Sequence, residues 1–177
     1  MLKRIWPFIF IFLFFSCAVW LQVSLIFAWP SFFNQINLVL IVLIFTLFFF
    51  DFYSALQAII VSGFWLDLYS FNFFGFYLII FFLTILLADW ILRSWLTNRS
   101  LYSFLLLIIL STLSYNLIIN TFWYFYSGNL VGFFLWQVDF WRAVLWQIAW
   151  GALAALLMFN LVGFVARRFQ PFFLKKQ

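Results

Sequence analysis

Residues 63–75 read Gly63-Phe-Trp-Leu-Asp67-Leu-Tyr-Ser70-Phe-Asn72-Phe-Phe-Gly75 and place one aspartate inside a stretch that is otherwise almost wholly apolar. The residues on both sides have the composition of a membrane-spanning helix. An ionised carboxylate at the centre of a bilayer costs about 2.5–3.5 kcal/mol. We therefore expect Asp67 to be buried against protein, to lie at the membrane interface, or to have a function.

The rest of the chain is as apolar as this stretch. Its 177 residues are 69% hydrophobic and only 7% charged, whereas soluble domains carry about 25% charged residues. A soluble domain of this size buries only about 70% of the surface that its unfolded chain exposes, so this much apolar surface requires lipid around it. The composition predicts an all-α integral membrane protein with a single transmembrane domain.

Six apolar runs are separated by short polar or aromatic breaks. They predict spans at about 5–28, 37–50, 53–68, 73–95, 101–126 and 139–165, followed by a basic tail at 166–177. As helices, the second and third runs would be about 21–24 Å long, shorter than a bilayer core of about 30 Å. They form either two short spans around Asp51 or one long bent segment. We favour two, because a single helix would put Asp51 near mid-membrane.

The basic residues flank the apolar runs and form no contiguous patch, which argues against nucleic acid as a partner. With six spans, eight of the nine basic residues fall on one side, as the positive-inside rule requires. These eight are Lys3, Arg4, Arg93, Arg99, Arg167, Arg168, Lys175 and Lys176. The pattern predicts that both termini are cytoplasmic.

The sequence shows no catalytic constellation. It contains no His and no Glu, and no metal-binding or phosphate-binding motif is visible. A hydrolase or metalloenzyme would need such groups. We therefore expect a non-enzymatic protein with no metal and no cofactor.

The charged residues inside the helices occur in pairs with helical spacing. Asp89 and Arg93 are four residues apart, and Asp139 and Arg142 are three apart. Residues at these spacings share a helix face, so both pairs are predicted to form ion pairs.

Two further helix faces have a distinctive composition. Thr112, Asn116 and Asn120 follow one another at four-residue spacing, which predicts a polar face for helix packing, a polar cavity or a partner-helix seam. Gly151 and Ala155 form a small-xxx-small pair, which permits close helix approach. That face serves either internal packing or an intermolecular contact.

The pattern Gly63-x-x-x-Asp67-x-x-Ser70, followed by Phe74-Gly75, resembles the central signature of the MreD family of bacterial rod shape-determining membrane proteins. The motif covers about 13 residues, and the hydropathy resemblance covers the whole chain. The resemblance implies a six-helix bundle like that of the substrate-binding subunits of energy-coupling-factor transporters.

The same resemblance implies a non-enzymatic scaffold in the cell-wall elongation complex of the bacterial inner membrane. Its partners would be an MreC-like protein and the enzymes that build lateral peptidoglycan. The alternative is a substrate-binding subunit of a vitamin transporter, which shares the expected fold. Asp67 then either caps the next helix, by accepting backbone N–H groups, or organises a surface for a partner's helix.

Overall fold

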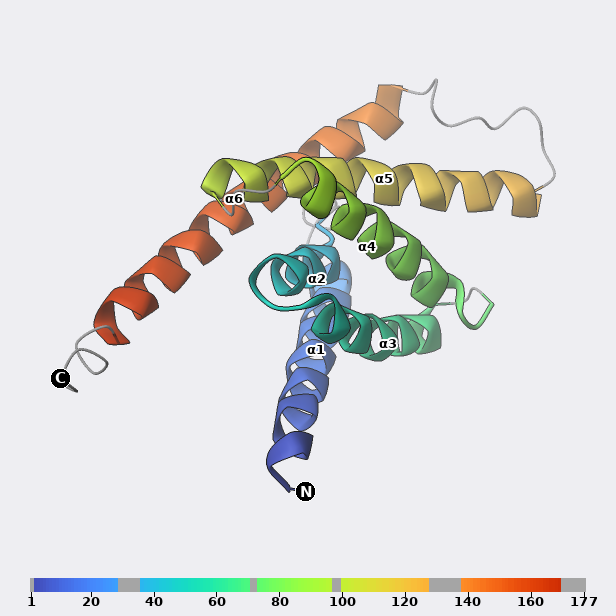
Figure 1. Ribbon diagram of the computed structural model, residues 1–177. Coiled ribbons are helices and arrows are strands. Elements are labelled where there is room, and N and C mark those ends of the chain that lie inside the picture. Colours follow the sequence, from blue (N-terminus) through green and yellow to red (C-terminus); the bar gives the residue numbers. More distant parts are fainter. Residues whose placement is uncertain (1, 29–35, 71–72, 97–99, 128–137, 170–177) are drawn as a thin grey trace, which may run out of the picture.

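The computed structural model describes residues 2–28, 36–70, 73–96, 100–127 and 138–169, and within these ranges every regular element is an α-helix (Figure 1). The helices are α1 (Leu2–Ala28), α2 (Leu38–Phe49), α3 (Phe52–Tyr69), α4 (Phe76–Ser94), α5 (Leu101–Ser127) and α6 (Val138–Phe169). In an apolar solvent the helix satisfies its own backbone hydrogen bonds, which explains why continuous apolar runs adopt it.

The helix boundaries follow the breaks seen in the sequence. The chain between 37 and 68 forms two helices, separated at Phe50 and Asp51, where the backbone is extended. Helix α4 begins at Phe76 rather than Phe73, because the residues before it form a turn. Helix α6 continues to Phe169, so that Arg167 and Arg168 belong to its last turn and not to a tail.

The shortest of the six helices, α2, lies at the centre of the fold. It contacts α1, α3, α4, α5 and α6, and nine of its twelve residues are buried. The Phe104 ring of α5 packs against three aromatic rings of α2, those of Phe45, Phe48 and Phe49. A length of about 18 Å is sufficient for a helix that is surrounded by others on most of its surface.

The start of α2 is held by two amide side chains. Asn37 is its N-cap residue, and its Oδ1 accepts a 3.1 Å hydrogen bond from the backbone N–H of Leu40. Gln22 of α1 accepts a 2.8 Å bond from the N–H of Val39 through its Oε1. Both bonds satisfy donors that the first turn of a helix leaves unpaired.

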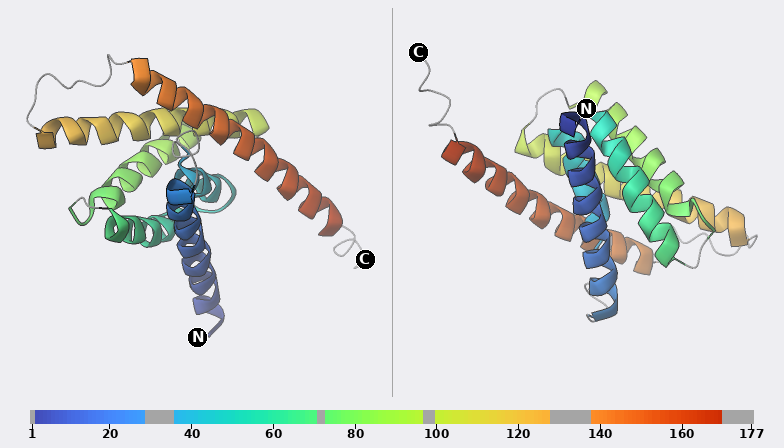
Figure 2. Two further views of the ribbon diagram at one scale, coloured as in Figure 1. Left: turned by 180° about the vertical axis from the view of Figure 1, so that it is seen from behind. Right: turned by 90° about the horizontal axis from the view of Figure 1, so that it is seen from below.

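The other helices are arranged around α2. Helices α3 and α4 lie side by side, α4 packs on α5, and α6 crosses α5 (Figures 1 and 2). The C-terminal half of α6 extends beyond the packed helices in all three views. Helix α6 is therefore joined to the fold mainly through its contact with α5.

Three stretches among the described residues are long and apolar enough to cross a membrane: Phe76–Ser94, Leu101–Phe125 and Phe140–Met158. The apolar stretches Ile9–Ser24 and Leu38–Phe49 are shorter. The all-helical fold with these candidate spans supports a membrane protein. That the chain crosses the membrane six times, and in which orientation, stays a prediction.

Candidate functional site: the corner between α3 and α4

Asp67 lies in the last turn of α3 and caps the following helix. Its Oδ2 accepts a 3.0 Å hydrogen bond from the backbone N–H of Gly75, and its Oδ1 accepts a 2.8 Å bond from the N–H of Tyr77. The side chain is buried, with 5% of its surface exposed. A carboxylate beside the positive end of a helix dipole is favourable, and bonds to a charged acceptor are stronger than neutral ones.

The chain reverses direction at Gly75, which is the N-cap residue of α4. Gly75 has a φ of +96°, in the left-handed region that residues with a Cβ rarely adopt. Having no side chain, it cannot cap its own helix, and Asp67 supplies the acceptor from the preceding helix. The turn is completed by a 3.2 Å bond from the N–H of Phe76 to the carbonyl of Phe73.

Gly63 lies one turn before Asp67 and meets the first turn of α4. A Cβ added at Gly63 would be 2.8 Å from the Cα of Leu78 and 3.1 Å from its backbone nitrogen. Real Cβ atoms do not approach backbone this closely, so the two helices can touch here only because residue 63 is glycine. This close approach brings the N-terminus of α4 within reach of the Asp67 carboxylate.

Ser70 ends α3. Its N–H donates a 2.9 Å bond to the carbonyl of Leu66, and its hydroxyl donates a 3.3 Å bond to the backbone carbonyl of Asp67. The structure thus brings Gly63, Asp67, Ser70 and Gly75 together at one corner, and three of them are joined directly by hydrogen bonds. Of the two roles expected for Asp67, the structure shows the cap on the next helix, and a surface for a partner's helix stays a prediction.

The surface of this corner is aromatic and apolar. Phe74, Leu68 and Tyr69 are 66%, 55% and 43% exposed, and the Tyr69 ring stacks on Trp65 at a centroid distance of 6.2 Å. A partner that approached the corner would contact these side chains, because the carboxylate of Asp67 faces inward. Asp67 can therefore influence a partner only through the position of the corner.

A second polar contact joins α5 and α6. The amide nitrogen of Asn116 donates 2.8 Å bonds to the carbonyl of Thr112 and to Oε1 of Gln147 in α6. The Thr112 hydroxyl bonds the carbonyl of Ile108 within its own helix, and Asn120 is half-buried. Of the polar face predicted on α5, Asn116 is the member with a hydrogen bond to another helix.

Of the two small residues of α6, Gly151 packs against α5 and Ala155 is buried in the core. A Cβ at Gly151 would lie 2.9 Å from Cγ2 of Ile108, and Ala155 is only 1% exposed. Of the two predicted uses of this face, the structure shows internal packing for both residues.

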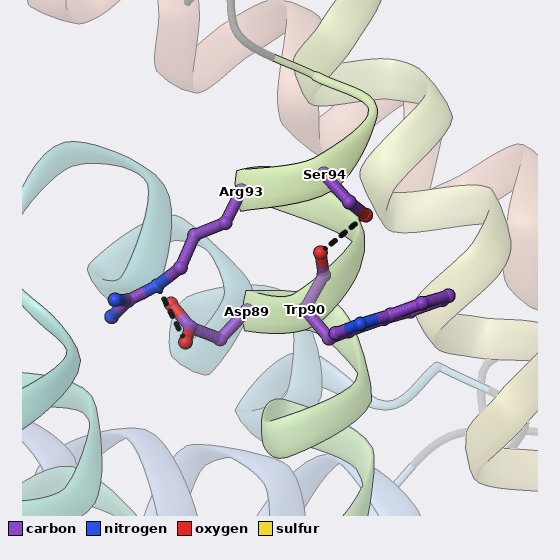
Figure 3. Close-up of polar contacts among 4 residues, drawn as sticks. All are labelled: Asp89, Trp90, Arg93 and Ser94. Carbon is purple, nitrogen blue, oxygen red and sulfur yellow. Dashed lines mark hydrogen bonds and ion pairs between the residues drawn. The ribbon is translucent and has the colours of Figure 1, made fainter.

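One of the two predicted ion pairs is formed. Nε of Arg93 lies 2.8 Å from Oδ2 of Asp89, one turn earlier on α4 (Figure 3). The Arg93 side chain is 69% exposed and that of Asp89 17%, so the pair lies at the surface. Arg142 is exposed, whereas the side chain of Asp139 lies outside the described residues, and so does the pairing predicted for it.

Two contributing side chains, those of Gln22 and Gln147, have little or no signal in the sequence. Gln22 and Gln147 look like isolated polar residues in apolar helices, and their partners are more than 15 residues away along the chain. Asn37 does carry a signal, because asparagine directly before an apolar run is a typical N-cap. Among the described residues, no group of three or more His, Cys, Asp or Glu side chains could hold a metal ion.

Comparisons of the chain with protein-family models, with curated proteins and with solved structures found no match.

Proposed function

We propose that this chain is a non-enzymatic membrane scaffold of the bacterial cell-wall elongation complex, similar to MreD proteins. The observation that supports the proposal is the corner between α3 and α4. The residues that carry the resemblance, Gly63, Asp67, Ser70 and Gly75, form one structural unit through a close helix approach, a left-handed turn and a carboxylate cap. The spacing of these four residues is therefore explained by one structural feature, the turn that joins α3 to α4.

A scaffold of this kind would act by presenting helix surfaces at fixed angles. The cap and the close approach at Gly63 hold α3 against α4. The exposed side chains of Leu68, Tyr69 and Phe74 beside them form an apolar surface. The proposed partner is an MreC-like protein, with the lateral peptidoglycan enzymes next to it. The proposed location is the inner membrane, with six spans and both termini in the cytoplasm.

The partner is tested by crosslinking the tagged chain in its own cell envelope and identifying what co-purifies. We expect an MreC-like protein and cell-wall elongation enzymes. Recovery of an ATPase with a coupling membrane subunit would contradict the scaffold and favour the vitamin-transporter alternative. The variant Asp67→Ala is compared with Asp89→Ala, whose ion pair lies at the surface. The scaffold predicts loss of the partner with Asp67→Ala only, and unfolding measured in parallel separates misfolding from lost assembly.

The orientation is tested separately with reporter fusions. Alkaline phosphatase, which is active only outside the cytoplasm, is fused after Asn34, Asn98, Asn129 and Lys176. We expect activity after Asn34 and Asn129 and none after Asn98 and Lys176. Activity after Lys176 would exclude a topology with six spans and a cytoplasmic amino terminus.

A further inference from the structure

We draw no further inference here: the strongest candidate, the apolar groove of about 540 Å³ that is lined by side chains of α1, α2 and α3, carries none, because nothing in the structure shows what covers it.

Discussion

Gly63 of α3 and Leu78 of α4 lie in backbone contact, so that a Cβ on residue 63 would meet the Leu78 Cα at 2.8 Å. Helices without large side chains between them can approach this closely and gain dispersion contacts, which drive helix association in lipid. The contact also aligns the end of α3 with the start of α4. The geometry of the Asp67 cap depends on that alignment.

Replacing Gly63 with Ala should lower the free energy of unfolding by about 1–3 kcal/mol, as other overpacked sites do. The nearest atoms belong to the backbone of Leu78, so Leu78→Ala should not rescue the variant. Unfolding by titration of SDS into mixed micelles measures both. A Gly63→Ala protein as stable as the unmodified chain would mean that the helices can separate there freely.

Substitutions at Gly75 probe the backbone conformation of the turn, whereas substitutions at Gly63 probe helix packing. A Cβ at this residue would meet nothing within 4 Å, so the cost of Gly75→Ala comes from its φ of +96° alone, about 1–2 kcal/mol. Asn tolerates the left-handed region better, and Gly75→Asn should lose less stability than Gly75→Ala. At Gly63 the order should be reversed, with Asn worse than Ala. The same order at both positions would show that the two glycines do not have these different roles.

Asp67→Ala removes both acceptors from the start of α4 and leaves the N–H groups of Gly75 and Tyr77 unpaired. We expect a loss of about 2 kcal/mol. In the Asp67→Ala variant, the amide hydrogens of Gly75 and Tyr77 should exchange faster than in the unmodified chain. Amides in the middle of α4 should change less. Asp67→Asn keeps one acceptor oxygen and should lose less. Unchanged exchange at both amides would contradict the cap.

Asn116 and Gln147 should be energetically coupled across α5 and α6. A double-mutant cycle with Asn116→Leu and Gln147→Leu should give a coupling of about 0.6 kcal/mol, and at most about 1.7, because interhelical hydrogen bonds in membranes are modest. Asn120→Leu with Gln147→Leu provides the control pair, for which we expect no coupling. Additive effects in the first cycle would indicate that the bond does not form in the bilayer.

The pair formed by Asp89 and Arg93 should contribute little. Arg93 is largely exposed, and surface ion pairs are worth about 0–1 kcal/mol. Asp89→Ala should therefore lower the free energy of unfolding by less than Asp67→Ala, although both remove one carboxylate. The structure indicates that burial distinguishes the two carboxylates. An equal loss of stability in the two variants would contradict this difference.

The local parts of the fold could be read from the sequence. The six helical segments, the break at Asp51 and the role of Asp67 as an acceptor at the following turn follow from apolar run length, turn residues and the cost of an isolated carboxylate. These signals are local, since a helix closes its hydrogen bonds within a few residues. The small residues Gly151 and Ala155 indicated a close contact, but not which helix would fill it.

By itself, then, the sequence determined an apolar chain of six helices whose composition requires lipid, and it marked Gly63, Asp67 and Gly75 as special. Only the tertiary structure decided that the short α2 is the centre, that Gln22 caps it from α1, and that Asn116 meets Gln147. The physical reason is that helix formation depends on neighbours along the chain. The choice of partners across helices depends on the packing of all six together.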